Sequence, residues 1–180
     1  MANQNEFAYY EPLARVLLKA LNYDIAIISF QSKIISNFLG RHVEVDVMLY
    51  RSEDKKILSI EVKSRRDKVL EGFTKAILNS IFSNETYIAL AGEALSLLDL
   101  VIQLSHKISF VGIIKIEKED YRTLKEFTEK DKDLKNFVFG KLIYNAPRSS
   151  EPYNVLHEQV IKEIFAKYDR LKERGQIIER

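Results

Sequence analysis

Two strand-like segments separated by a short polar run constrain this chain more than any other feature. Residues 42–50 alternate, with Val or Leu at every second position from 43 to 49. The polar run RSEDK covers 51–55, and residues 57–63 form a second apolar segment. A period of two is typical of a strand with one buried face, and a short polar connection favours an antiparallel hairpin. We therefore predict a hairpin whose apolar side packs on a core.

Charged residues gather at the open end of this hairpin. In the second strand, Glu61 and Lys63 share one face, whereas Ile60 and Val62 share the opposite, apolar face. Asp46 lies in the first strand, almost symmetric with Glu61 about the turn. We therefore expect the two carboxylates to face each other with the lysine beside them. The alternative interpretation is an ordinary solvated strand face with alternating charges.

Two opposed carboxylates favour a bound cation. They repel each other, and a cation between them removes the repulsion. Mg²⁺ prefers oxygen ligands and is often held by one or two carboxylates together with waters and a substrate phosphate. The chain has no Cys and its three His are scattered, so nothing indicates zinc. The pattern thus predicts a Mg²⁺ site.

A third acid, Glu11, lies in a predicted helix over residues 6–22. It shares helical spacing with Phe7, Ala14 and Leu18, which places it on the expected apolar stripe. A carboxylate on a buried face is costly unless a metal or another group compensates it. The alternatives are that Glu11 only interacts with the helix N-terminus, or that Glu6 has this role instead.

The remaining pattern indicates one α/β domain over residues 1–180 with a central mixed sheet flanked by helices. Strands are predicted at 25–30, 86–90 and 108–116, and helices at 67–82 and 94–104, which extends the order to αβββαβαβ. Residues 6–116 are assigned to the core of this domain. Residues 117–180 form a C-terminal extension, with a charged segment at 117–136, a strand near 137–144 and an amphipathic helix at 154–174.

Asp46, the hairpin turn and the run Ile60-Glu61-Val62-Lys63 resemble the motif of the PD-(D/E)xK nuclease superfamily. Glu11 matches the glutamate of that family's first helix, and the resemblance covers residues 6–116. It implies a restriction-endonuclease-like αβββαβ core, nearest in pattern to archaeal junction resolvases and Mrr-like nucleases. Two positions depart from the pattern. Val45 replaces the motif's proline, and Lys75 stands where some members carry a glutamine after the E-x-K strand.

The resemblance also implies roles for these residues. Asp46, Glu61 and the backbone carbonyl of Val62 would bind Mg²⁺, with Mn²⁺ as a substitute. Glu11 would ligate through water or complete a second metal site, and Lys63 would orient the attacking water. The implied reaction is hydrolysis of DNA phosphodiester bonds by in-line attack, in repair, recombination or restriction.

Basic residues follow the motif closely. Residues 51–68 include seven Lys or Arg and four Asp or Glu. The candidates for binding DNA phosphates are Arg41, Arg65, Arg66, Lys68 and Lys75. No recognition helix or finger motif is evident, so structure-selective binding is favoured over sequence-specific binding. The alternative is a solubilising surface.

Bulk properties narrow the remaining choices. The net charge of +2 neither demands nor excludes nucleic acid. The first residues lack the basic and apolar regions of a secretory signal, and no apolar run is long enough for a membrane span, so a cytoplasmic location is expected. Three hypotheses stay open. They are an active nuclease, an inactive nucleic-acid-binding or assembly module with the same fold, and an α/β interaction protein or homodimer that uses helix 154–174 as its contact surface.

Overall fold

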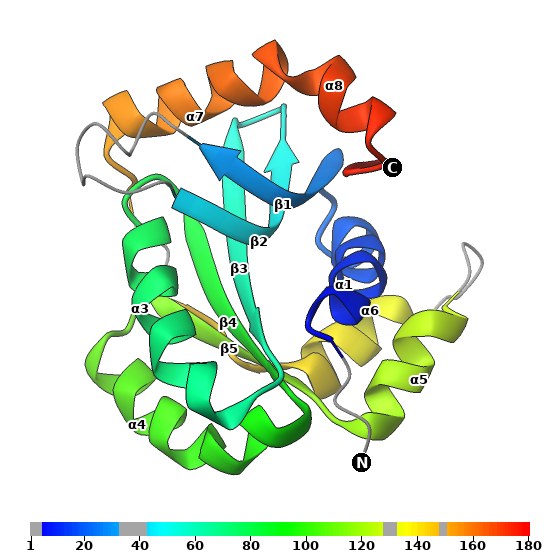
Figure 1. Ribbon diagram of the computed structural model, residues 1–180, viewed down its shortest axis with the longest axis vertical. Helices are drawn as coiled ribbons and strands as arrows, with labels where there is room; N and C mark the ends of the chain where they lie inside the picture. Colours follow the sequence, from blue (N-terminus) through cyan, green and yellow to red (C-terminus); the bar gives the residue numbers. More distant parts are fainter. Residues whose placement is uncertain (1–4, 33–42, 128–132, 148–150) are drawn as a thin grey trace.

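A computed structural model describes residues 5–32, 43–127, 133–147 and 151–180 (Figure 1). Within these ranges the chain forms a seven-stranded mixed sheet of order β6-β5-β4-β3-β2-β1-β7, flanked by helices on both faces. The strands are β1 Ile25–Ser32, β2 Val43–Arg51, β3 Lys56–Lys63, β4 Glu85–Ala91, β5 Val111–Ile116, β6 Ile143–Asn145 and β7 Ile177–Glu179. The helical elements are α1 Phe7–Ala20, η1 Arg66–Lys68, α3 Val69–Asn79, η2 Gly92–Leu97, α4 Leu98–Lys107, α5 Lys118–Glu126, α6 Leu134–Phe137, η3 Val138–Leu142, α7 Asn154–Ala166 and α8 Tyr168–Glu173. Arg41 falls outside the described residues.

The predicted hairpin is confirmed. Strands β2 and β3 pair antiparallel from Val47 opposite Ile60 to Arg51 opposite Lys56. Continued by one step, this register sets Asp46 opposite Glu61. Strand β3 lies in the middle of the sheet and pairs parallel with β4, so both of its faces are covered. This rules out the alternative interpretation of a solvated strand face for Glu61 and Lys63, because a central strand between two layers of helices has no solvated side.

The expected alternation of β2 is interrupted at Asp46. Val47 packs with the core against α1, whereas Val45 packs with the core on the opposite face. The paired strand β1 changes at the same level, because Ser29, which lies opposite Asp46, has a left-handed backbone with φ of 55°. The prediction that Val43, Val45, Val47 and Leu49 share one face was therefore wrong between Val45 and Val47. In both β1 and β2, the described side chains beyond this level point to the opposite face of the sheet from the one that the alternation predicts.

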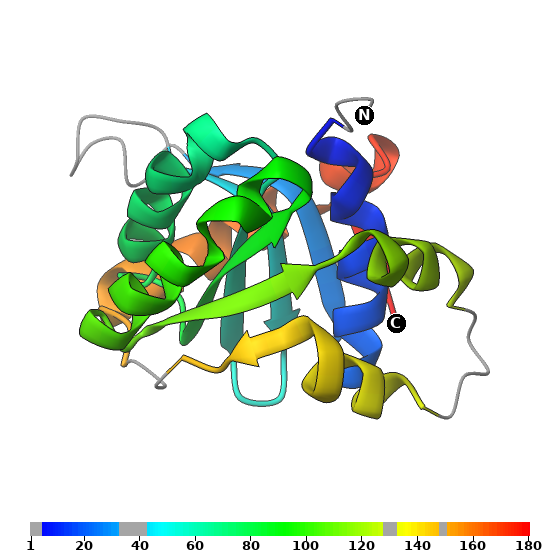
Figure 2. The same ribbon diagram turned by 90° about the horizontal axis from the view of Figure 1, so that it is seen from below.

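Helices α1, α5 and η3 cover one face of the sheet, and their buried residues join one apolar core that includes Leu17, Leu58, Tyr121 and Leu142. On the other face, α3 and α4 cover the half formed by β4 and β5. Helices α7 and α8 cover the half formed by β1 and β2 (Figures 1 and 2). The open end of the hairpin thus lies where three helical groups meet the sheet.

The C-terminal extension differs from expectation in two places. Residues 134–142 are helical, and only Ile143–Asn145 form the strand predicted near 137–144. The predicted helix 154–174 is divided into α7 and α8 at Lys167, which lets the chain bend around the edge of the sheet. The apolar stripe of these helices is buried on the chain's own sheet at Leu156, Val160, Ile164 and Leu171.

Two further contacts join the extension to the core. Strand β7 pairs antiparallel with β1 and becomes one edge of the sheet. The ring nitrogens of His157 lie 2.7 Å from the carbonyl oxygen of Phe82 and 2.8 Å from that of Lys55. In the described part of the chain, no helix has both the length and the apolar character needed to cross a bilayer.

Candidate active site

The E-x-K strand ends inside the protein rather than at its surface. Glu61 is 1% exposed and Lys63 is 5% exposed. Both side chains lie on the β3 face covered by α3, and the Lys63 stem crosses that helix at Gly72. A Cβ on Gly72 would lie 2.6 Å from Cγ and Cε of Lys63, so only glycine allows the stem to pass in this position. Strand and helix together fix where the amine points.

The amine of Lys63 lies among four oxygen-bearing groups. Nζ donates to the carbonyl oxygen of Val62 at 2.8 Å and to Asp46 Oδ2 at 3.2 Å. Glu61 Oε2 and Glu6 Oε2 each lie 3.7 Å from Nζ. We call Glu6, Asp46, Glu61 and Lys63 the carboxylate–lysine cluster. The expected meeting of Asp46, Glu61, Lys63 and the Val62 carbonyl is therefore present.

Asp46 is held by two further contacts. The Val62 N–H donates to Asp46 Oδ2 at 2.8 Å, and the Tyr10 hydroxyl hydrogen-bonds the same carboxylate. Burial and the nearby Asp46 both raise the pKa of Tyr10, so its hydroxyl stays protonated and can donate. The burial of Tyr10 was predictable from helical spacing, but its contact with Asp46 depends on the packing of α1 against β2.

Glu11 is not part of the cluster. Its side chain is 58% exposed and pairs with Arg15 at 2.7 Å. The apolar stripe itself is confirmed at Tyr10, Ala14, Leu17 and Leu18, which are buried. Phe7 is 62% exposed, however, and Glu11 one turn later shares its exposed face rather than the stripe. Glu6, the competitor named from sequence, is the acid that reaches the site. Its Oε1 accepts the Ser64 N–H at 3.3 Å, which ties the start of α1 to the end of β3.

Asn79 takes the place that was expected for Lys75. Its Nδ2 donates to Glu61 Oε1 at 2.9 Å from the last turn of α3. Lys75 lies one turn earlier, pairs with Glu71 at 3.6 Å and acts on Glu61 only as a nearby charge. An amide after the E-x-K strand is therefore present four residues beyond the position chosen from sequence. The two residues lie on the same face of α3, one turn apart, so only the position of the helix along its axis distinguishes them.

Glu61 is the residue of the cluster whose hydrogen bonding and protonation are most unusual. Among the described residues, no hydrogen bond reaches its Oε2, although that atom is buried. Burial and the repulsion of Asp46 raise the pKa of Glu61 to about 8, even though Lys63, Lys75 and the Asn79 amide act in the opposite direction. Burial alone would lower the pKa of Lys63, but the surrounding carboxylates outweigh it and raise the value. The amine is therefore charged, and the cluster retains an excess of acid.

These donors fit a hard divalent cation. Carboxylate and carbonyl oxygens are the ligands that Mg²⁺ and Mn²⁺ select, and the orphan oxygen of Glu61 supplies a free lone pair. Within the described ranges, no three His, Cys, Asp or Glu residues converge tightly enough to form a ligand set without further donors. Two carboxylates and one carbonyl are sufficient when waters and a phosphate complete the shell.

The basic residues beyond the motif are mostly engaged with nearby acids. Arg65 pairs with Asp67 at 2.9 Å, and Lys68 pairs with Glu71 at 2.9 Å. Arg66 is exposed on η1, and no hydrogen bond or ion pair links it to another described residue. All three lie just after the cluster, as expected, yet Arg66 alone presents its charge without a local acid.

Fold and site together define an α/β protein with a buried carboxylate–lysine cluster at the end of a central strand. Comparisons of the chain with protein-family models, with curated proteins and with solved structures each find no match. What the cluster does is therefore argued from its own geometry and from the motif.

Proposed function

We propose that the chain is a Mg²⁺-dependent DNA nuclease built on a restriction-endonuclease-like αβββαβ core. One observation carries this proposal. Asp46, Glu61 and Lys63 are brought together at the end of β3, and a buried oxygen of Glu61 accepts no hydrogen bond from the described residues. The order of α1, the three strands, α3 and β4 agrees with such a core.

The burial of Glu61 and Lys63 argues against the alternative that they belong to an ordinary solvated strand face. Charged side chains on a solvated strand face stay hydrated and do not reduce the free energy of unfolding. Buried ionisable groups lose their hydration, which costs several kcal/mol unless other groups compensate it. Strand β3 would be more stable with apolar residues at 61 and 63, as elsewhere along it. Perturbed ionisable groups of this kind cluster at functional sites, which supports a catalytic role.

Each residue of the cluster has a distinct role in this proposal. Asp46, Glu61 and the Val62 carbonyl would hold the divalent ion, which when bound supplies Lewis-acid stabilisation of charge on the phosphate. Tyr10 and Asn79 orient the two carboxylates through their hydrogen bonds.

The lysine has to release one contact to act. Its amine now donates to the Val62 carbonyl, and it would turn from there toward the attacking water and the phosphate. In that position the ammonium orients the water and offsets negative charge at the reacting phosphorus. Glu6, in place of Glu11, is the third acid of the site and can accept a hydrogen bond from water at its edge.

A cleavage panel tests the function directly. Linear, branched and single-stranded DNA are incubated with Mg²⁺ or Mn²⁺ and the full chain. We expect cleavage that falls by about 100-fold or more in Asp46→Ala, Glu61→Ala and Lys63→Ala, as is usual when a group that stabilises the transition state is lost. Glu11→Ala is the matched control and should retain full activity, whereas Glu6→Ala should not. Folded wild-type protein that cuts none of these substrates would contradict the proposal.

A second candidate is an inactive nucleic-acid-binding or assembly module of the same fold. The observation in its favour is that the Lys63 ammonium already lies within 4 Å of oxygens from Glu6, Asp46 and Glu61, and so partly neutralises them. Calorimetric titration with Mn²⁺ separates the two functions. Binding that disappears in Asp46→Ala supports the nuclease, and no binding at millimolar Mn²⁺ supports the module. A homodimer would suit cleavage of two strands, and light scattering measures the oligomeric state.

A further inference from the structure

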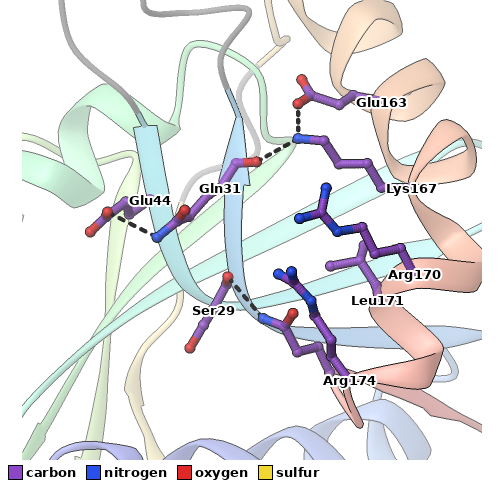
Figure 3. A pocket seen from close by; sticks show the side chains of 9 residues that line it. Ser29, Gln31, Glu44, Glu163, Lys167, Arg170, Leu171 and Arg174 are labelled. Atoms are coloured by element: carbon purple, nitrogen blue, oxygen red, sulfur yellow. Dashed lines mark hydrogen bonds and ion pairs between the residues drawn. The ribbon is translucent and has the colours of Figure 1, made fainter.

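A groove separates the outer edge of β1 from the junction of α7 and α8 (Figure 3). Its volume is about 590 Å³. Strand β7 pairs with β1 only from Ile25 to Ile27. Beyond that point no strand of the described residues pairs with this edge of β1, which forms one wall of the groove. The lining residues are Ser29, Gln31, Glu44, Glu163, Lys167, Arg170, Leu171, Arg174 and Gln176. We call this feature the basic groove.

The lining of the basic groove is polar and carries more positive than negative charge. Small-molecule sites of this size are lined mostly by apolar and aromatic side chains, whereas Leu171 is the one apolar residue of this set. Lys167, Arg170 and Arg174 are opposed by the carboxylates of Glu44 and Glu163. A charged, extended ligand fits this lining better than an apolar one.

The acids of the groove are already engaged. Glu163 pairs with Lys167, whose amine also donates to the Gln31 carbonyl oxygen at 3.0 Å. Glu44 accepts the Gln31 side-chain amide at 3.1 Å. Gln176 closes the same wall by donating to the Ile28 carbonyl oxygen at 3.0 Å. The walls are thus held by their own hydrogen bonds.

Arg170 and Arg174 differ from these residues. Both guanidinium groups point from the helix toward β1, and no ion pair links either one to another described residue (Figure 3). Four positions apart, they lie one helical turn from each other, with about 6 Å of rise between them. Guanidinium groups bind phosphate oxygens in a two-pronged manner, so this pair suits two phosphates of one strand.

The groove begins beside the candidate active site in the strand register. Ser29 lies between Ile28, which pairs with Val47, and Phe30, which pairs with Val45, so it is opposite Asp46. Directly opposed residues in an antiparallel pair have Cα atoms about 5 Å apart. The groove therefore starts at the same level of the sheet as the carboxylate–lysine cluster, one strand farther out.

We propose that the basic groove binds the sugar–phosphate backbone of the DNA strand beside the bond that is cut, with Arg170 and Arg174 as the phosphate ligands. This inference rests on the proposed nuclease function and assigns it a binding track on the C-terminal extension, away from the basic residues after β3. The extension then serves both to cover the β1–β2 core and to hold substrate.

Binding without catalysis tests the proposal. Anisotropy of a fluorescent oligonucleotide is measured in EDTA over a range of salt concentrations. Arg170→Ala/Arg174→Ala should weaken binding at least 10-fold and reduce the slope of log affinity against log salt by about 2, because each lost phosphate contact lowers that slope by about one. The control Arg122→Ala/Lys125→Ala removes the same charge from α5 and should leave both quantities unchanged. Thermal denaturation checks that each variant is folded.

A second variant, expected to bind DNA more tightly rather than more weakly, gives a result that misfolding would not produce. Glu44→Gln removes a carboxylate from the groove while keeping an oxygen for the Gln31 amide, so DNA affinity should rise several-fold.

In cleavage assays the double arginine variant should have a raised KM and a kcat within about twofold of the wild type. The reason is that the lost contacts bind the substrate and the transition state equally.

The outcomes distinguish the groove from the nuclease. Cleavage by the wild type with equal DNA affinity and salt slope in the double arginine variant overturns the groove and leaves the nuclease standing. The expected binding losses without any cleavage keep the groove and overturn the nuclease. Titration with a free deoxynucleoside monophosphate tests whether the groove binds a free nucleotide rather than DNA. Tight binding that needs Arg170 and Arg174, with no effect of these arginines on DNA, would assign the groove to a free nucleotide and overturn the proposal.

Discussion

At the scale of single residues, Glu61 is a carboxylate that lies buried inside the sheet with one of its two oxygens hydrogen-bonded. One oxygen accepts the Asn79 amide at 2.9 Å, and the other has no hydrogen bond from the described residues. Burial disfavours the charged form, and Asp46 adds repulsion, so the side chain keeps its proton to a higher pH than a free glutamate. Under the proposed function, a divalent ion would bind here by displacing that proton.

This protonation predicts a pH-dependent cost in stability. The folded pKa of Glu61 is about 8 and the unfolded value is 4.5, so between these values the folded protein binds a proton that the unfolded chain has lost. The free energy of unfolding therefore falls as pH rises through this window, by about 1.4 kcal/mol for each pH unit that is crossed. Glu61→Gln cannot ionise, and its advantage in Tm over the wild type should grow from near zero at pH 4.5 to about 10 °C or more at pH 8.5.

The control is Glu11→Gln, the same substitution at an exposed residue. Its difference in Tm from the wild type should not grow through the same range. Thermal denaturation of the three proteins without divalent ions gives the comparison. A Glu61→Gln advantage that is constant with pH would show that the buried carboxylate is ionised throughout.

At the scale of elements, the contact of α3 with β3 determines where the lysine lies. Gly72 faces the Lys63 stem, and Asn79 two turns later faces Glu61 on the same strand. One helix thus positions both halves of the E-x-K motif. Asn79 and Lys75 lie on the same face of α3, so a shift of the helix by one turn along its axis would exchange them. Local spacing alone does not give that axial position, which explains why the sequence led to Lys75.

Gly72→Ala should separate stability from catalysis. Alanine favours a helix over glycine by about 0.5–1 kcal/mol, but here its Cβ would meet Lys63 carbons at 2.6 Å. We expect the lysine stem to be displaced, with at least a 10-fold lower kcat and little change in KM for DNA. Mass spectrometry after amine modification should show faster labelling of Lys63, which is almost fully buried in the wild type.

Gly140→Ala provides the matched control, because no atom lies within 4 Å of the Cβ it would add. It should label at the wild-type rate and retain activity. Unchanged labelling and unchanged kcat in Gly72→Ala would mean that the close approach of strand and helix does not hold the amine.

At the scale of the whole molecule, local patterns predicted the parts of the fold that depend on neighbours in sequence. The period of two and the polar turn were enough to predict the β2–β3 hairpin and the approach of Asp46 to Glu61. The α/β order followed from the alternation of segments. The hairpin and the approach of the two carboxylates need only the register of one strand pair, which the turn fixes.

Features that depend on distant packing were not predictable in the same way. Phe7 has the character of a core residue but is exposed, and this moved the expected helix acid from Glu6 to Glu11. The basic groove joins β1 to a helix junction more than a hundred residues later, as the contact of Lys167 with Gln31 illustrates. Strand β7 has three residues, too few for a periodic signal.

Metal binding should be visible in the stability of the whole chain, because the cluster lies on β2, β3 and the residue before α1, and Asn79 of α3 holds it. A ligand that binds only the folded state at about 100 times its Kd adds about 2.7 kcal/mol. For a chain of this size that corresponds to a rise in Tm of about 5–10 °C. We expect such a rise with Mn²⁺, its reversal by EDTA, and its loss in Asp46→Ala. The rise should be larger at pH 8.5 than at pH 6, because the proton on Glu61 competes with the ion below its pKa of about 8. An equal rise in Asp46→Ala would locate the ion elsewhere in the molecule.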